Sequence, residues 1–120
     1  MIASEYNITI DRAAEYDFVL TIRDDAQQLI DLSVGTTFHS DIREVGSKKE
    51  VVSFTPTLVT GSMGQVLFAL SEAATLELNP SRSYEYDIFM RRNGSTRRLV
   101  FGSVTVRANI TKGSPVDPTI

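Results

Sequence analysis

Apolar and polar residues alternate along most of this chain, and a period of two predicts an all-β protein. The alternation is clearest in three segments, 16–24, 36–44 and 65–70. Further strands are expected at 6–10, at 50–59 and in both arms of 84–107, with a short apolar piece at 29–32. Helical periodicity is nearly absent. One or two helical turns are expected after Ser71, a good N-cap residue, and before Asn79-Pro80.

The arms of 84–107 are joined by Asn93-Gly94, which predicts a long β-hairpin. A type I′ turn needs positive φ at both central residues, and Asn-Gly supplies this at low cost. A two-residue turn pairs Ile88 with Leu99 and Tyr86 with Phe101 on one face. Beyond Phe101, Val104 and Val106 then fall one residue out of phase with this apolar face. We therefore expect a β-bulge at Gly102-Ser103.

About seven short strands with frequent turn signals predict an antiparallel β-sandwich of immunoglobulin-like architecture with one short helical turn. Tyr84 follows the helical turn and is a candidate tyrosine corner, although a β-favoured aromatic residue explains it equally simply. Pro56 cannot donate a ladder hydrogen bond, so it is expected at an edge, a bulge or a strand end. Residues 1–111 are expected to form a single domain, and 112–120 an extended C-terminal tail.

Composition narrows the classes of partner. The 120-residue chain has no cysteine and a net charge of -3, which fits a reducing cytoplasm and argues against broad nucleic-acid binding. No stretch approaches the roughly 20 apolar residues of a membrane helix. The N-terminus has neither a basic segment nor an apolar core, so no secretory signal is expected. We expect no contact with nucleic acid or membrane.

Candidate catalytic groups are few. His39 is the only histidine, and its phase places it on the solvent side of its strand. Asp24-Asp25 is typical of a turn, and Glu85 and Asp87 alternate with core positions. No phosphate-binding loop or nucleophile motif occurs. We expect no catalytic residue, metal site, cofactor or small-molecule substrate, and hence no enzyme.

An arginine cluster at the hairpin tip is the sharpest local feature. It comprises Arg91, Arg92, Arg97 and Arg98, with Arg91 and Arg98 expected to flank the turn from opposite faces. Charges on a protruding hairpin prevent edge-to-edge aggregation. Arginine forks also pair with carboxylates of an acidic partner, which makes the four residues candidates for partner docking. The sequence leaves both interpretations open.

Two stretches resemble a recurring pattern of tailed-bacteriophage proteins. The first runs from Leu29 through Ile-Asp-Leu to Ile42-Arg43. The second is Tyr84-Glu-Tyr-Asp-Ile, then Asn93-Gly94, then Arg98-Leu-Val-Phe-Gly-Ser-Val-Thr-Val, and Ile110-Thr111. The chain is similar to small virion proteins and to the N-terminal Ig-like domains of phage baseplate upper proteins. It departs from the pattern in having Ser33 and Val34 before Gly35. We also expect no receptor-binding domain after residue 120, which distinguishes it from the baseplate proteins.

The resemblance implies a β-sandwich with a structural role in a virion assembled in the bacterial host cytoplasm. The expected function is a non-enzymatic tail, neck, baseplate or fibre-attachment component, present in many copies and docking other virion proteins, with a homo-oligomer expected. A capsid decoration or cement protein is the first alternative. A carbohydrate-binding β-sandwich module is the second, although its usual exposed aromatic platform conflicts with aromatics that fall in phase with core faces.

Overall fold

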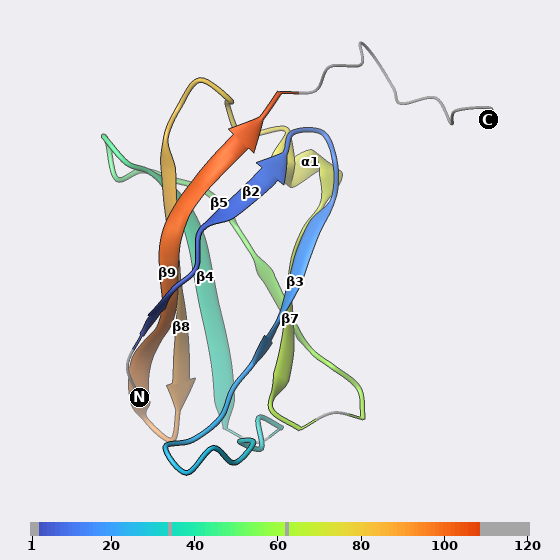
Figure 1. The fold of residues 1–120 in the computed structure, drawn as a ribbon, viewed down its shortest axis with the longest axis vertical. Coiled ribbons are helices and arrows are strands. Elements are labelled where there is room, and N and C mark those ends of the chain that lie inside the picture. The colour runs from blue at the N-terminus through green and yellow to red at the C-terminus, as the bar shows by residue number, and fades with distance from the viewer. Residues whose placement is uncertain (1–2, 34, 62, 109–120) are drawn as a thin grey trace, which may run out of the picture.

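The computed structural model describes residues 3–33, 35–61 and 63–108, which form two stacked β-sheets (Figure 1). The larger sheet has the strand order β1-β9-β8-β4-β5, with β2 also pairing with β9. The smaller sheet has the order β3-β7-β6. The larger sheet comprises β1 (Ser4–Glu5), β2 (Ile8–Asp11), β4 (Thr36–Glu44), β5 (Glu50–Ser53), β8 (Tyr84–Arg92) and β9 (Ser95–Arg107). The smaller comprises β3 (Tyr16–Thr21), β6 (Thr55–Leu58) and β7 (Gln65–Leu70).

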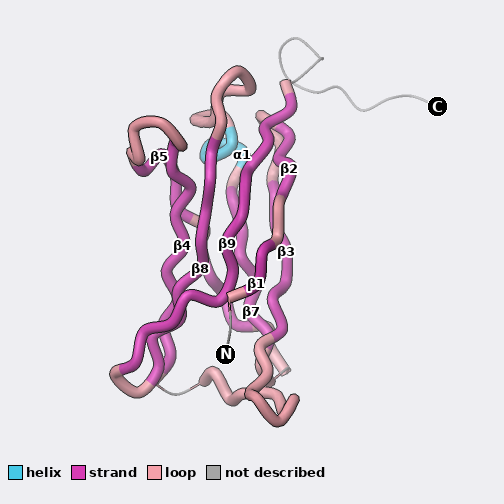
Figure 2. The backbone as a smooth tube through the Cα atoms, turned by 60° about the vertical axis from the view of Figure 1, so that its left-hand side comes forward, coloured by secondary structure: helices cyan, strands magenta, loops and turns pink. Residues whose placement is uncertain are grey.

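The strand order is that of an immunoglobulin-like sandwich, which confirms the predicted fold class. Strands β3, β7 and β6 correspond to B, E and D, and β5, β4, β8 and β9 to C′, C, F and G. The N-terminal strands β1 and β2 pair with β9 in parallel. The strands run along the long axis, so the connecting loops gather at two ends (Figure 2). The hairpin tip, residues 22–33 and the turn residues 59–61 and 63–64 lie at the same end.

The core is built from the inward phase of each alternating strand, and aromatic rings dominate its centre. Phe68 is fully buried and stacks on Phe18 at 5.6 Å between ring centroids. Phe54 meets Phe18 edge-on at 5.6 Å and packs on Tyr86 at 6.1 Å. In antibody domains a cysteine stands two residues after the corner tyrosine. Here that position is Tyr86, so packed rings link the two sheets of a cysteine-free chain.

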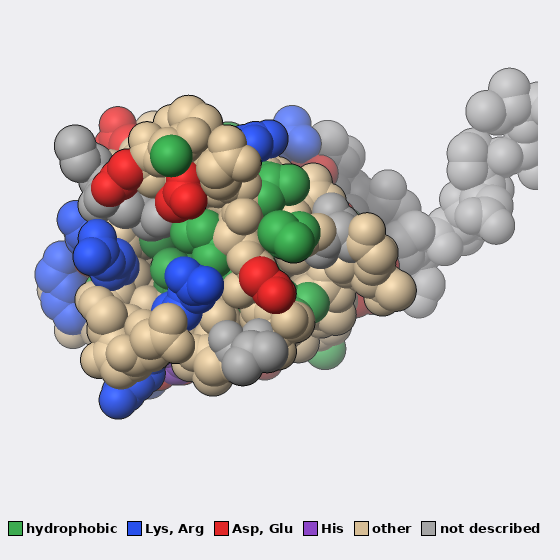
Figure 3. Space-filling view, turned by 90° about the horizontal axis from the view of Figure 1, so that it is seen from below, with side chains coloured by type: hydrophobic (Ala, Val, Ile, Leu, Met, Phe, Trp, Pro, Cys, Tyr) green, Lys and Arg blue, Asp and Glu red, His purple; other side chains and the backbone are tan. Residues whose placement is uncertain are grey.

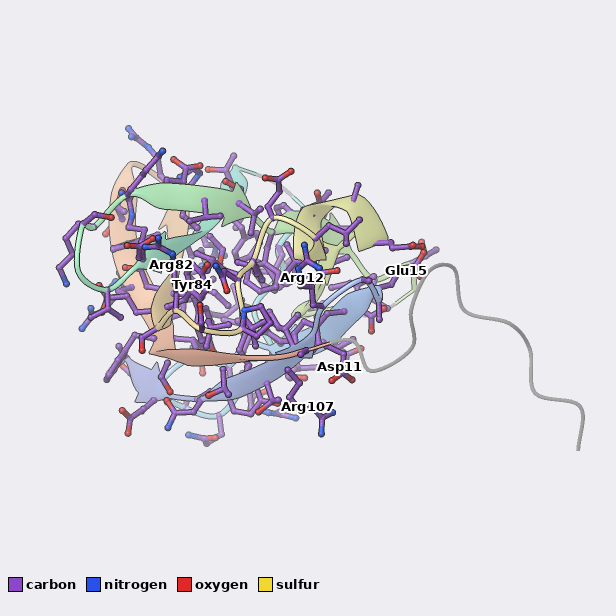
Figure 4. All side chains as sticks on the ribbon, turned by 90° about the horizontal axis from the view of Figure 1, so that it is seen from above. Asp11, Arg12, Glu15, Arg82, Tyr84 and Arg107 are labelled. Atoms are coloured by element: carbon purple, nitrogen blue, oxygen red, sulfur yellow. The ribbon has the colours of Figure 1, made fainter. Side chains whose placement is uncertain are left out.

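The helical turn α1 (Glu72–Thr75) connects the sheets and forms a tyrosine corner. The Ser71 hydroxyl caps α1 by accepting from the Ala74 N–H at 3.2 Å, as predicted. The Tyr84 hydroxyl accepts a hydrogen bond from the Asn79 N–H at 2.9 Å, which is the corner geometry. Arg12 donates to two carbonyls after α1, and Figure 4 shows it between the N-terminal strands and this corner.

Most predicted strands are present, but one strand prediction needs revision. The 50–59 segment is not one strand. It changes sheet at Phe54, so β5 belongs to the larger sheet and β6 to the smaller. Pro56 lies in the edge strand β6, as expected. The short apolar piece expected at 29–32 is present: Ile30 and Leu32 are buried and anchor the loop, and Leu29 forms a single bridge with Arg23. The expected tail at 112–120 lies outside the described residues.

The bulge in the hairpin lies closer to the turn than predicted. The register shifts between Ile88 and Phe89, so Ile88 pairs with Val100 and the extra residue is Leu99. Tyr86 consequently faces Gly102 rather than Phe101. Both Leu99 and Val100 are buried, because the bulge turns two consecutive residues inward.

Candidate functional site

The hairpin tip has the predicted type I′ backbone. Asn93 and Gly94 have φ of 52° and 79°, and Arg92 pairs directly with Ser95. The Asn93 N–H donates to the Gly35 carbonyl at 3.4 Å, which joins the tip to the start of β4. The arginines therefore stand on a short, fixed turn attached to a packed sheet.

The four arginines divide into two pairs, and the expectation that Arg91 and Arg98 lie on opposite faces is wrong. Arg91 pairs with Thr96, and Arg98 with Phe89, two residues before Arg91 on β8. Alternation therefore places Arg91 and Arg98 together on the outer face of the larger sheet. Arg92 and Arg97 share the inner phase, beyond the end of the core.

Arg92 and Arg97 line a hollow of about 370 Å³ at the loop end of the sandwich. Ile30 and Met90 form its apolar part, and Asp24 and Asp25 line the same hollow. The Arg92 Nε atom is buried and makes no hydrogen bond within the described part of the chain. Figure 3 views this end: basic side chains gather on one side, acidic ones on another, and apolar atoms lie between them. The hollow is thus a groove with charged rims of opposite sign.

The acidic rim is shaped by local hydrogen bonds. Asp24 Oδ1 accepts from the N–H groups of Ala26 and Gln28 at 2.9 Å each, which confirms the predicted turn chemistry. Asp31 accepts from the Ser33 hydroxyl at 2.6 Å and from the Ser33 N–H at 3.0 Å. These hydrogen bonds, with the charge of Arg92, lower the pKa of Asp31. Asp31, which lies near enough to Arg92 to be affected by its charge, therefore carries negative charge at neutral pH.

Of the outer pair, Arg98 lines a second, more polar hollow of about 500 Å³ on the larger sheet, whereas Arg91 lines a separate hollow with His39 and Phe89. The Arg98 guanidinium lies over the Phe101 ring, 4.6 Å from its centroid. Burial raises the pKa of the neighbouring Asp87 carboxyl, against the opposing effects of Arg98 and Arg43. Arg98 is therefore engaged by its own sheet, so Arg91 is the more available of the two.

His39 lies on this outer face with its side chain exposed, as predicted, but its geometry differs from that of a catalytic base. Its Nε2 contacts Asp41 Oδ2 at 2.9 Å, and Ser53 donates its hydroxyl to Asp41 Oδ1 at 2.6 Å. A serine nucleophile needs the imidazole between hydroxyl and carboxylate. Here the carboxylate is in the middle. Burial raises the pKa of Asp41, but the hydrogen bond from Ser53 and the neighbouring His39 and Arg43 outweigh it and lower that pKa overall.

Within residues 3–33, 35–61 and 63–108, no three His, Asp or Glu side chains gather closely enough to hold a metal ion. In the same ranges, no helix reaches the length and apolarity needed to span a bilayer.

Sequence reasoning identified the arginines but not the acidic rim opposite them. In the sequence Asp24-Asp25 is typical of a turn, and the pattern around Asp31 indicates no site. Asp24 and Asp25 line one hollow with Arg92 and Arg97 because residues 22–33 and the hairpin tip reach the same end of the sandwich. Nothing in the local pattern signals that meeting.

Comparisons with known proteins bear on the fold. No family model matches the sequence. No curated protein matches it either. Among solved structures, the chain is similar to the N-terminal Ig1-2 module of the Drosophila receptor protein tyrosine phosphatase DLAR, with 12% identity and a TM-score of 0.44. The match covers 90% of this chain and 48% of that one, so the chain spans about half its length. The immunoglobulin-like assignment here rests on strand order and the tyrosine corner.

Proposed function

We propose that this protein is a non-enzymatic structural component of a tailed-phage virion, in the tail, neck, baseplate or fibre attachment. In this proposal it docks other virion proteins through its loop end. The phage setting is supported by the two sequence stretches that resemble small virion proteins. In the structure these stretches include β4, the hairpin β8–β9 and the loop anchors Ile30 and Leu32. The residues that resemble the phage pattern therefore form the strands and loop anchors on which the loop end is built.

The observation that carries the docking role is the pairing of a rigid basic tip with an apolar groove. Arg92 and Arg97 project from a two-residue turn beside Ile30 and Met90. Arginine anchors beside apolar surface are typical of interface hot spots. Leu29 and Met63 are also exposed, the latter at 53%, in the two neighbouring loops. A partner with carboxylates and an apolar side chain fits this surface.

The absence of catalysis in this proposal is supported by the geometry around His39. The one imidazole contacts a carboxylate that is already held by Ser53 and Arg43. Both hydrogen-bonding sides of the Asp41 carboxylate are occupied by its own sheet. We interpret this cluster as cross-strand stabilisation.

Immunogold labelling of purified particles tests the virion proposal. We expect label at the tail or baseplate. Label spread over the capsid would instead favour a decoration protein, and absence of the chain from intact particles would refute a virion role. A glycan array that returned a specific ligand would favour the carbohydrate-binding alternative.

A charge reversal tests the docking surface. The double substitution Arg92→Glu/Arg97→Glu is expected to reduce incorporation into particles. Lys48→Glu/Lys49→Glu is the matched control, since it changes charge equally at the opposite end of the sandwich. If both double variants were incorporated into particles equally, Arg92 and Arg97 would serve solubility rather than docking.

A further inference from the structure

Three of the four edge positions in the two sheets are protected against pairing with another strand. In the smaller sheet, β6 carries Pro56, which cannot donate to a ladder. In the larger sheet, β5 is four residues long and is interrupted by a register shift, with Val51 unpaired between the partners of Ile42 and Arg43. The N-terminal edge is divided into β1 and β2, of two and four residues. Short strands, bulges and proline are the usual means of blunting an edge.

The fourth edge, β3, has none of these features. Its six residues, Tyr-Asp-Phe-Val-Leu-Thr, include no proline, glycine or lysine, and within the described chain it pairs only with β7. The Ile22 N–H donates to the Gly64 carbonyl at 2.7 Å, so even-numbered residues face β7. The N–H and C=O groups of Asp17, Val19 and Thr21 therefore point away from β7. In Figure 2, β3 forms the right-hand rim of the sandwich.

The side chains of β3 are also incompletely covered. Its inward residues Tyr16, Phe18 and Leu20 are all only half-buried. The inward residues of the neighbouring β7 are buried, and the central one, Phe68, is 0% exposed. On the outward face, Val19 is 50% exposed. An exposed apolar strand with a free edge is the usual site of strand addition.

We propose that a second copy of this chain pairs antiparallel along β3, with the two-fold axis at Val19. Directly opposed residues share a face, so this register sets Val19 against Val19 and Asp17 against Thr21 of the other copy. Beyond the ends of β3 it sets Glu15, one residue before Tyr16, against Arg23 of the other copy, two residues after Thr21, and symmetry produces that pair twice. Arg23 forms a bridge with Leu29, and its guanidinium donates one hydrogen bond to the Gln27 carbonyl at 3.2 Å. Figure 4 shows Glu15 at the rim of the sandwich.

Charge favours this register over its neighbour toward the N-terminus. Moving the axis to Asp17 opposes two aspartates, and like charges directly opposite destabilise a strand pair. The register centred on Val19 instead places Glu15 opposite Arg23 at both ends of the strand pair. It also buries the exposed Val19 side chain. The same pairing extends the smaller sheet across the axis and covers the half-buried rings. The segment from Glu15 to Arg23 is thus self-complementary.

This surface is separate from the arginine loop end, so the inference goes beyond the proposed function. Pairing of two copies along β3 could be observed even if phage particles lacked the protein. Labelling of a phage tail could be observed even if the protein were monomeric. The two experiments therefore fail independently.

Cysteine cross-linking tests the axis. The chain has no cysteine, so Val19→Cys introduces a single thiol. Paired residues on adjacent strands have Cα atoms about 5.5 Å apart, within disulfide range. Thr57→Cys is the control, because Thr57 and Val19 both pair with Leu67 and occupy one row at opposite edges of the sheet. We expect a disulfide-linked dimer from Val19→Cys and not from Thr57→Cys. Equal cross-linking of both variants would overturn the proposal.

Charge exchange tests the register by analytical ultracentrifugation over a concentration series. Glu15→Arg and Arg23→Glu should each weaken self-association, by about tenfold when like charges are opposed at both ends. An equimolar mixture of the two single variants should form a mixed dimer, because each then meets the opposite charge. The double variant should associate as the unaltered chain does. A monomer at every concentration, or singles that associate normally, would overturn the proposal.

Discussion

We expect Gly102→Ala to destabilise this protein, although glycine-to-alanine changes in strands normally stabilise. Gly102 lies opposite Tyr86 on the inward phase of β9, where the N-terminal chain crosses between β1 and β2. A Cβ atom there would lie 2.8 Å from the Tyr6 carbonyl carbon, still closer to its oxygen, and 2.9 Å from Asn7 Oδ1. The first two of these neighbours are main-chain atoms, which cannot rotate away.

The magnitude follows from what must move. The Tyr6 main chain must retreat by roughly 1 Å to relieve the contact. That movement breaks the hydrogen bond from the Tyr86 hydroxyl to the Tyr6 carbonyl, now 2.5 Å, and strains the bond from the Ser103 N–H to Asn7 Oδ1. Each lost bond costs about 1 kcal/mol, and a buried hydroxyl left without a partner costs about 1–3 kcal/mol. We therefore expect a loss of about 2–4 kcal/mol in the free energy of unfolding.

Urea unfolding followed by far-ultraviolet circular dichroism measures this change. Gly46→Ala is the matched control, because no atom lies within 4 Å of its added Cβ and its φ is not in the left-handed region. At such a site alanine is expected to be neutral or to stabilise by about 0.4–1 kcal/mol. If Gly102→Ala stabilised as much as Gly46→Ala, the register that turns Gly102 inward would be refuted.

Further predictions concern the corner and the outer face. Tyr84→Phe removes the acceptor of the Asn79 N–H and should cost about 1–3 kcal/mol in urea unfolding, and a loss under a few tenths would contradict the corner's role. Burial raises the pKa of Asp87, so its charged form opposes folding, and the penalty appears as pH rises through its unfolded pKa. Asp87→Asn should therefore stabilise at pH 7 and be neutral near pH 3. Asp41 has a lowered pKa, so its stabilisation is present above its unfolded pKa and lost as pH falls through its folded pKa. Asp41→Asn should flatten the acid limb of the stability–pH curve, and an unchanged limb would contradict this.

Local alternation predicted the half-buried strands well. Strands β4 and β7 begin and end where the sequence placed them, because each has one face on the core and one toward solvent. Asn93-Gly94 predicted the turn for a purely local reason, the need for positive φ. The switch at Phe54 was missed because its flanking residues read as one continuous β-favouring run. Only the two-sheet packing shows that this side chain turns into the shared core.

The bulge could not be located from the sequence, because an extra residue at Leu99 or at Gly102 resets the phase equally well. What decides between them is a contact across 80 residues, in which Tyr86 donates to Tyr6. An inward Phe101 at this point would block the approach of the N-terminal chain. Glycine admits it, and the bulge at Leu99 is what brings Gly102 inward. The same shift turns Phe101 outward, where its ring meets the Arg98 guanidinium.

The position of the N-terminal strand links Gly102 to the free edge at β3. A sandwich of this type has an A strand that can pair with B. Here the N-terminal residues pair instead with β9, held over Gly102 by Tyr86 and by the Asn7 side chain. Because β1 and β2 are attached to the larger sheet, no described strand pairs with the outer edge of β3. Tyr6 contributes a partial cover, with its ring 5.9 Å from that of Phe18. The absence of a side chain at Gly102 thus favours the strand arrangement that leaves Tyr16–Thr21 open to a second copy.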